Sequence, residues 1–184
     1  EIDLTGGVLT NALAVTWPDD TVALNRTVSQ SGIHKRFLDD AAYENTDAMK
    51  AAVSAAGFKR PLLYAATEAT VDEYGSLAKE NDLPLAVRAD SVEALQPLTQ
   101  KLTAMGLKDL VLDPGSREIK QSLQDMVALR RAALKAGNRD LGFPTIGFPC
   151  EMASHLEMET LVASMFIAKY GSIVVMSDFT GETL

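Results

Sequence analysis

Five short apolar runs, none alternating with polar residues, constrain the fold of this 184-residue chain more than any other feature. A strand with one face in water alternates apolar and polar residues, whereas a strand covered on both faces by helices is continuously apolar. Between the runs the apolar residues follow helical spacing, which predicts repeated βαβ units. The runs cover residues 62–66, 85–87, 110–112, 145–148 and 173–176.

Repeated right-handed βαβ units form one of two architectures, an open doubly wound sheet or a closed TIM-type (β/α) barrel. A full barrel usually takes about 250 residues, so five clear units predict an α/β fold with a parallel barrel that is incomplete in this chain. We assign residues 46–184 to the barrel units. Residues 1–45 do not follow the repeat and are expected to form an irregular or hairpin segment with a turn at residues 18–20.

The charge and cysteine content exclude several classes of function. A formal net charge of -8 disfavours nucleic acid and anionic membrane surfaces as main partners, because both would repel the chain. A single cysteine, Cys150, can form neither an internal disulfide nor a thiolate metal cage, which fits a reducing cytoplasm. We find no membrane-spanning run and no secretory signal. The chain opens on Glu1 instead of methionine, so we expect it to be part of a longer protein.

Glycine and proline mark the predicted element boundaries. Gly57, Gly106, Gly137 and Gly171 each stand where a helix is expected to end, since glycine accepts a left-handed conformation there. Pro97 falls inside an apolar helical stripe and would remove an interior hydrogen bond. We therefore expect a kink or a late helix start at Pro97.

Functional groups in both α/β architectures gather where strands end and the following loops begin. Thr70 with Glu73 has the spacing of a capping box, and Asp90 with Glu93 is a similar pair. These structural roles compete with functional ones at every position of the rim. The residues at strand ends are Thr67, Glu68, Arg88, Asp90, Asp113, Arg117, Cys150, Glu151, Ser177 and Asp178.

Asp113, Arg88 and Asp90 are the candidates for a binding site at the barrel mouth. Pro114 and Gly115 would stop the strand sharply and leave the Asp113 carboxylate facing the mouth, either as a reactive group or as a brace for the next loop. The Arg88 guanidinium directly follows an apolar run and must meet a carboxylate, such as Asp90 or Asp113, or a bound anion. His34 and His155 are read as surface or capping residues, so no metal site and no catalytic residue is assigned.

Four segments together resemble the central barrel of the corrinoid iron–sulfur protein large (gamma) subunit, from the acetyl-CoA decarbonylase/synthase system. The likeness covers roughly residues 45–184 and is specific because the order, spacing and strand-loop strings agree. It implies a TIM-type barrel that pairs with a smaller barrel subunit. The segments are "KRPLLYAATEATVDEYGSLAKENDLPLAVRAD", "LKDLVLDPGSREIKQSLQDMVALRRAALK", "GFPTIGFP" and "MFIAKYGSIVVMSD".

The resemblance implies a methyl carrier in which a cobalt corrinoid takes a methyl group from a methyl-pterin and passes it to acetyl-CoA synthase. Corrinoid and a [4Fe–4S] cluster are implied for the full-length family subunit, but one cysteine leaves neither cofactor assigned to residues of this chain. The implied role here is scaffold and docking domain, with the small barrel subunit, the methyltransferase and acetyl-CoA synthase as partners. Whether the chain itself is an enzyme stays open.

Two other functions remain possible from the sequence. "LVLDPG" is also similar to a strand end of the pterin-binding barrels, so the chain could be a pterin-dependent methyltransferase with Asp113 as the pterin-binding carboxylate. Arg88 or Asp90 would then lie around the pterin. A generic sugar- or phosphate-binding barrel would need glycine and amide donors after residue 148, where Pro149 and Glu151 stand instead.

Overall fold

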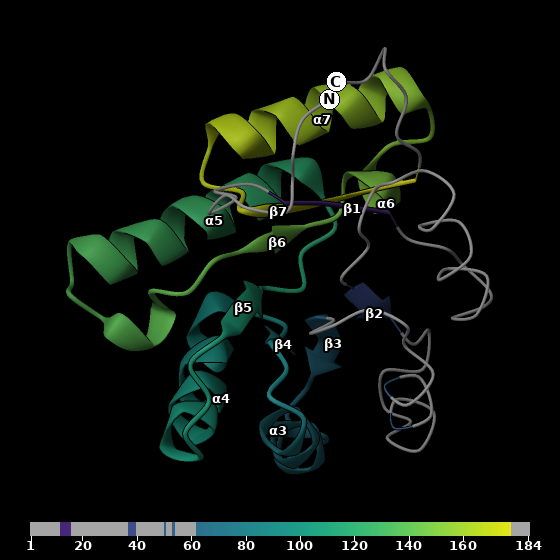
Figure 1. The fold of residues 1–184 in the computed structure, drawn as a ribbon. Coiled ribbons are helices and arrows are strands. Elements are labelled where there is room, and N and C mark those ends of the chain that lie inside the picture. The colour runs from purple at the N-terminus through teal and green to yellow at the C-terminus, as the bar shows by residue number, and fades with distance from the viewer. Residues whose placement is uncertain (1–11, 16–36, 40–49, 51–52, 54–61, 178–184) are drawn as a thin grey trace.

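The computed structural model describes residues 12–15, 37–39, 50, 53 and 62–177. Its strands all run parallel and belong to two sheets, ordered β2-β3-β4-β5 and β6-β7-β1 (Figure 1). One bridge between Leu112 and Thr145 joins β5 to the stretch that leads into β6. The strands therefore follow one another in the order β2-β3-β4-β5-β6-β7-β1, as in a partly formed parallel barrel. This confirms the predicted fold class.

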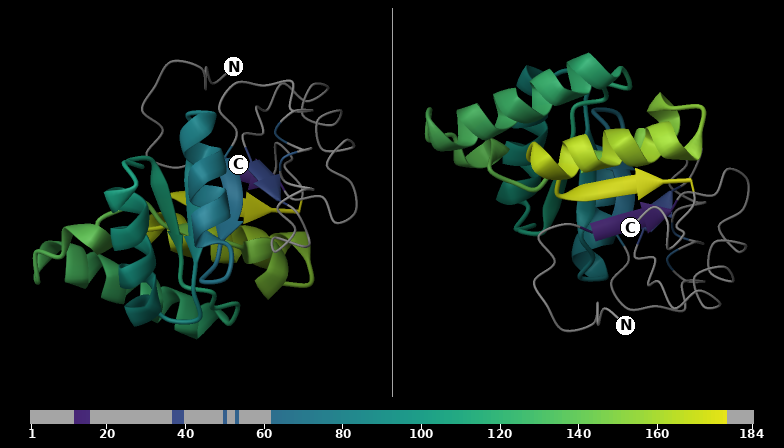
Figure 2. Two further views of the ribbon diagram at one scale, coloured as in Figure 1. Left: turned by 90° about the horizontal axis from the view of Figure 1, so that it is seen from below. Right: turned by 90° about the horizontal axis from the view of Figure 1, so that it is seen from above.

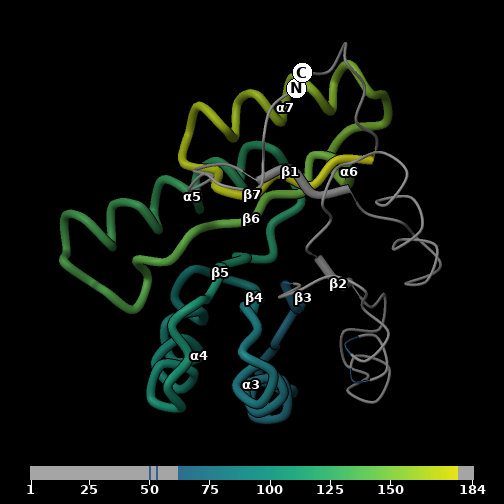
Figure 3. The backbone as a smooth tube through the Cα atoms, viewed as in Figure 1, coloured from purple at the N-terminus to yellow at the C-terminus, as the bar shows by residue number. Residues whose placement is uncertain are grey.

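All five predicted apolar runs are strands. The structure places them at Leu62–Ala66 (β3), Leu85–Arg88 (β4), Leu110–Asp113 (β5), Ile146–Gly147 (β6) and Ile173–Met176 (β7). Every residue of β3 and β5 is buried, as expected for strands covered on both faces. The repeat of strand and helix along the chain is visible in the backbone trace (Figure 3).

Two further strands come from the N-terminal segment that was expected to be irregular or a hairpin. Ala12–Val15 (β1) pairs in parallel with β7, and Phe37–Asp39 (β2) pairs in parallel with β3. These two stretches extend the sheets at their two ends. Residues 16–36, including the expected turn at residues 18–20, lie outside the described residues. The division of the chain at residue 45 stays a prediction.

Helices follow the strands in the described part of the chain and cover the outer face of the strands (Figure 2). Short helix α6 and helix α7 both come between β6 and β7, and a 3-10 helix precedes β6. The helices are Val71–Glu80 (α3), Val92–Ala104 (α4), Ile119–Leu134 (α5), Pro149–Met152 (α6) and Leu156–Ala168 (α7), with the 3-10 helix at Arg139–Leu141.

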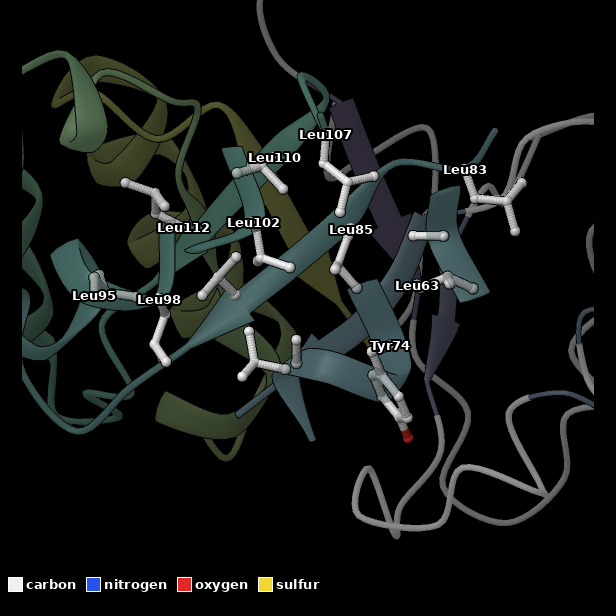
Figure 4. Packing of buried hydrophobic residues seen from close by; sticks show 14 of the residues in the cluster. Leu63, Tyr74, Leu83, Leu85, Leu95, Leu98, Leu102, Leu107, Leu110 and Leu112 are labelled. Atoms are coloured by element: carbon white, nitrogen blue, oxygen red, sulfur yellow. The ribbon is translucent and has the colours of Figure 1, made fainter. Parts of the chain in front are cut away.

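Side-chain alternation along the strands separates an outer core from an inner one. The outer core packs Leu63, Leu85 and Leu110 against α3 and α4 (Figure 4). The inner core unites residues of both sheets, namely Leu62, Tyr64, Ala65, Ala86, Val111, Ile146, Phe148 and Val175. Because residues of β3 and β7 meet in this inner core, the strands curve around it as they do in a barrel. Asp113 follows Val111 by two residues and therefore lies on the inner side.

The structure corrects two expectations about helix boundaries. Helix α4 begins at Val92, five residues before Pro97, with Ser91 as its N-cap. Of the two alternatives expected at Pro97 the late start is therefore wrong, and the kink stays a prediction. The Ser91 hydroxyl accepts the Ala94 N–H at 3.2 Å, and Asp90 is not the cap. The end of α4 agrees with prediction, because Gly106 has a φ of +97° and its N–H reaches the Thr103 carbonyl at 2.9 Å.

Candidate functional site

Asp113 lies at the carboxyl end of β5 and is almost completely buried, with 1% of its surface exposed. Four protein groups donate hydrogen bonds to it. Oδ1 accepts the Gly115 N–H at 2.8 Å and Arg117 Nη1 at 3.1 Å, while Oδ2 accepts Arg117 Nη2 at 2.9 Å and the Tyr64 hydroxyl. A carboxylate has about four acceptor positions. The four donors of this chain therefore occupy the acceptor positions of Asp113.

The DPG sequence explains the local geometry at Asp113. The bond from the Gly115 N–H to the side chain two residues earlier is an Asx-type turn, which ends the strand. Gly115 has a φ of +78°, and a Cβ built on it would lie 2.5 Å from the Ala89 carbonyl oxygen. Glycine is required here both for the backbone conformation and for the close approach to the loop after β4.

Arg117 connects Asp113 to the other elements around the mouth. Its Nη2 donates to the Tyr64 hydroxyl oxygen at 2.9 Å, its Nε donates to the Glu151 carboxylate, and its guanidinium carbon lies 4.3 Å from the centre of the Phe148 ring. The Tyr64 and Phe148 rings are themselves in tilted contact at 5.1 Å. These five residues, Tyr64, Asp113, Arg117, Phe148 and Glu151, are called the mouth cluster below.

Burial and charge shift two pKa values in the mouth cluster. Burial, together with the neighbouring Asp113 carboxylate, raises the pKa of Tyr64 above its ordinary value, although Arg117 opposes this shift. Burial alone would lower the pKa of Arg117, but the hydrogen bonds and charge of Asp113 outweigh it and raise that pKa. The phenol therefore stays protonated and the guanidinium stays charged, which suits a permanent ion pair better than a proton-transfer site.

The other two candidates lie near the mouth cluster with different environments. Arg88 is half-buried at the end of β4, in direct register with Asp113 on β5. Asp90 is exposed. The guanidinium that binds both Asp113 oxygens is that of Arg117, which the sequence had placed only among the residues of the rim.

Several predicted cap and rim residues have roles other than those expected. Thr70 stands at the N-cap of α3, but its side chain makes no cap hydrogen bond and instead accepts the Thr67 N–H at 3.0 Å. The capping box with Glu73 is therefore wrong. Glu68 is exposed, and Cys150 carries a half-buried thiol at the start of the four-residue helix α6. Asp178 lies outside the described residues.

Two further buried acids, each bonded to a serine after a strand end, were not found from the sequence. Glu159 of α7, 3% exposed, accepts the Ser177 hydroxyl at 2.6 Å and also the Ser177 N–H, which ties the end of β7 to α7. Asp125 of α5 accepts the Ser116 hydroxyl and Gln121 Nε2, the latter at 2.9 Å. Acidic side chains are usually exposed, so the partner groups explain the burial of these two.

Tyr64 and Phe148 were also missed as part of a polar site. Both belong to predicted apolar runs and were read as core residues, and both are buried. The signal in the sequence was the alternation of side chains between the two faces of a strand. Tyr64 falls two residues after Leu62, so both lie on the inner face of β3. Its hydroxyl must then reach a polar group inside the barrel, because a buried tyrosine usually finds a hydrogen-bond partner.

Among residues 12–15, 37–39, 50, 53 and 62–177, no group of three His, Cys, Asp or Glu side chains could hold a metal ion. His155 is exposed at the N-cap of α7 and makes no side-chain cap bond, while His34 lies outside this part. A search of the same residues finds no helix of the length and apolarity needed to cross a membrane.

Comparison with known proteins identifies related sequences over most of the chain. The family described as CO dehydrogenase/acetyl-CoA synthase delta subunit (CdhD) matches residues 25–184. The corrinoid/iron–sulfur protein large subunit of Moorella thermoacetica is 41% identical over 166 residues, which cover 90% of this chain and 37% of that protein. The acetyl-CoA decarbonylase/synthase complex subunit gamma of Archaeoglobus fulgidus is 30% identical, covering 71% and 30% of the two chains. This chain thus spans about a third of the length of these relatives.

A solved structure also resembles this fold. The DAHP synthase of Thermotoga maritima superposes with a TM-score of 0.50 at 12% identity, covering 95% of this chain and 63% of that enzyme. At this identity the likeness concerns the fold alone. It agrees with the parallel strand order and the inner core described above.

Proposed function

Because the chain belongs to the corrinoid iron–sulfur protein large (gamma) subunit family of the CO dehydrogenase/acetyl-CoA synthase system, we propose that it forms the barrel portion of a methyl-carrier subunit. In this proposal the barrel acts as scaffold and docking domain while a methyl group passes from a methyl-pterin to acetyl-CoA synthase. The small barrel subunit, the methyltransferase and acetyl-CoA synthase are its partners.

The state of Asp113 is the observation that carries the scaffold role. A carboxylate that recognises a pterin must offer oxygen atoms to the ligand, whereas both Asp113 oxygens accept donors from this chain and its surface is 1% exposed. A pterin would have to displace Tyr64, Gly115 or Arg117 and leave a buried donor without an acceptor, which costs about 1–3 kcal/mol. This cost favours the scaffold over the pterin-dependent methyltransferase.

The iron–sulfur cluster of the family does not fit the residues of this chain. A [4Fe–4S] cluster is usually held by four cysteine thiolates, and the chain has one cysteine. The cluster therefore belongs outside this chain, and no step of the proposed function depends on ligands from it. The contribution of the chain is a rigid barrel and its surfaces.

Two binding measurements test the proposal. Gel filtration of the purified chain mixed with the small barrel subunit should yield a complex of the two. Calorimetric titration of the chain with methyltetrahydropterin should show no saturable heat. Two results together would overturn the scaffold role in favour of the pterin-dependent methyltransferase. They are saturable pterin binding that Asp113→Asn abolishes, and the absence of a complex with the small subunit.

The exposed Glu68→Gln variant is the matched control for the titration. It changes a carboxylate at the same rim that makes none of the Asp113 contacts. If pterin bound equally well to both variants and to the original chain, Asp113 would not be the recognition group. That result would contradict the methyltransferase alternative as well.

A further inference from the structure

Helix α5 differs from the other α-helices of the described part in its exposed charges. Within α5 every exposed charged side chain is a cation, because its one acid, Asp125, is buried. Each of the other described α-helices carries at least one exposed acid. The chain as a whole has a formal net charge of -8, so composition does not account for this positive charge. The exposed cations are Lys120, Arg130 and Arg131 of the helix and Lys135 at its C-cap.

The helix dipole explains only part of this pattern. It favours acids in the first turn and bases at the end of a helix, which suits Arg131 and Lys135. Lys120, however, stands in the first turn, where α5 has no acid and α3, α4 and α7 each have one or more. Arg131 and Lys135 are also four residues apart, a spacing at which like charges repel each other. The cations are thus placed at a small cost to the helix, which favours a role in binding.

The cations of α5 have no acidic partners in the described part of the chain. No carboxylate there lies within ion-pair distance of any of the four. On the neighbouring helices, by contrast, Lys101 of α4 binds Asp72 of α3 at 2.7 Å. The Arg130 guanidinium carbon lies 5.7 Å from the centre of the Tyr170 ring. This cation–π contact orients the guanidinium without neutralising its charge.

The flanks of α5 are both covered by described elements. Leu129 and Ala132 pack in the outer core with α4 and the 3-10 helix, while Ile119 and Leu123 pack with residues of α7. Helix α5 therefore lies between two neighbours, with the strands on its inner side (Figures 1 and 2). Its outer side is not a place where a further helix of the barrel would pack.

Three of the cations follow one stripe along this outer side. Arg131 comes eleven residues after Lys120, and Lys135 is one turn further, so the stripe is about 22 Å long at 1.5 Å per residue. The small, exposed Ala128 lies beside the stripe and lets another backbone approach closely. Leu134, 67% exposed, adds a large apolar side chain next to Lys135.

We propose that the outer face of α5 docks the barrel onto an acidic surface of a partner subunit, whose carboxylates pair with Lys120, Arg131 and Lys135. Charge complementarity identifies the partner, because cations without acidic partners attract carboxylates and speed association. The apolar Leu134 in the same face suits a protein surface better than a phosphate backbone, which the net charge of -8 would also repel. The inference deepens the proposed function and rests on it, since it names the surface by which the docking domain binds.

Zero-length cross-linking tests the contact in the chain purified together with its partner subunits. A carbodiimide joins a lysine amine to a carboxylate only where the two are in contact. Mass spectrometry should find Lys120 and Lys135 joined to Asp or Glu residues of one partner subunit. Lys79, exposed in the last turn of α3, is the internal control and should form no such link. The absence of links from Lys120 and Lys135, or links only within their own polypeptide, would overturn the inference.

Charge reversal measures the contribution of the cations to binding. Lys120→Glu should raise the dissociation constant for the cross-linked partner about tenfold. The same change puts an acid in the first turn, where it favours the helix, so weaker binding would not result from unfolding. Lys135→Glu should act in the same direction, whereas the matched control Lys79→Glu should leave the constant unchanged. A Lys120→Glu variant that binds as tightly as the original chain would overturn the inference.

Salt and phosphate ligands separate this proposal from its alternatives. Raising the salt from about 0.1 M to about 1 M, which shortens the Debye length from about 10 Å to about 3 Å, should weaken the original complex more than that of Lys120→Glu. Binding to RNA or phosphatidylserine vesicles that Lys120→Glu abolishes would assign the face to phosphate groups and overturn the inference. A complex indifferent to salt and to Lys120→Glu would overturn this inference alone, whereas the absence of any complex would overturn the proposed function as well.

Discussion

Arg117 binds both carboxylate oxygens of Asp113, with Nη1 3.1 Å from Oδ1 and Nη2 2.9 Å from Oδ2. The two residues are four positions apart, so their ion pair holds the loop that follows β5 against the end of that strand. A two-point arginine–carboxylate contact fixes orientation as well as distance. The loop after β5 is therefore held in one conformation by its own residues.

Asp113→Asn should lower the free energy of unfolding by about 2–4 kcal/mol, because removing one charge of a largely buried pair leaves the other uncompensated. Urea denaturation followed by circular dichroism would measure the loss. Asp90→Asn, an exposed residue at the same rim, should leave the unfolding midpoint unchanged. Equal effects of the two variants would mean that the Asp113 contacts contribute nothing to stability.

Tyr64 should make the protein sensitive to alkaline pH. Its pKa is raised by burial and by Asp113, so the fold retains a proton that the unfolded chain releases near pH 10. The stabilisation is fully present below about pH 10 and declines as pH rises beyond it, by at most about 1.4 kcal/mol per pH unit.

Urea titrations between neutral pH and pH 11 should show a steeper alkaline loss of stability for the original chain than for Tyr64→Phe. The other tyrosines are unchanged in the variant and serve as an internal reference. Parallel pH profiles for the two proteins would contradict the raised pKa of Tyr64. At neutral pH the variant should be less stable by about 1–2 kcal/mol, since Asp113 and Arg117 each lose a hydrogen bond.

Gly115→Ala should destabilise the protein more than Gly106→Ala. Both glycines have a positive φ, so both variants incur a backbone cost of about 1 kcal/mol. Only at Gly115 would the added Cβ also collide with the Ala89 carbonyl oxygen, whereas nothing lies within 4 Å at Gly106. Thermal unfolding of the two variants should therefore differ, and equal melting temperatures would argue against the close contact between the two loops.

Glu159→Gln should loosen the end of β7. The amide cannot accept from both the hydroxyl and the N–H of Ser177 as the carboxylate does, so we expect a loss of about 1–3 kcal/mol. Hydrogen exchange at the Ser177 amide should become faster. Glu80→Gln, an exposed position in the last turn of α3, should leave that exchange rate unaltered.

The strands were predictable because burial on both faces leaves a direct mark on sequence. A continuous apolar run such as residues 110–112 can hardly lie at a water-covered surface, and its position between helical segments predicts a parallel partner. β1 and β2 lack this mark. They are three or four residues long and precede the regular repeat that was assigned from residue 46, so their pairing depends on contacts with β7 and β3 that no local pattern records.

The mouth cluster was predictable in part. A charged residue at the end of a buried strand has to find a partner, which drew attention to Asp113 and Arg88. The arginine that binds both Asp113 oxygens is Arg117, four residues farther along the chain. Tyr64 comes from a strand 49 residues earlier, and only the register of β3, β4 and β5 brings its hydroxyl to Asp113. Similarly, the choice of Ser91 over Asp90 as helix cap depends on the backbone angle at which the chain enters α4.

Few backbone contacts connect the two sheets. They are the Leu112–Thr145 bridge and the hydrogen bond from the Leu112 N–H to the Pro144 carbonyl at 2.7 Å. Above this join, Arg117 reaches from Asp113 on one side to Glu151 and Phe148 on the other. Backbone hydrogen bonds between strands use groups that nearly every residue has. A guanidinium contact, in contrast, exists only where an arginine and its acceptors are present. The alignment of the two sheets thus depends on side chains. A relative with another residue in place of Arg117 must hold the two sheets together through different contacts.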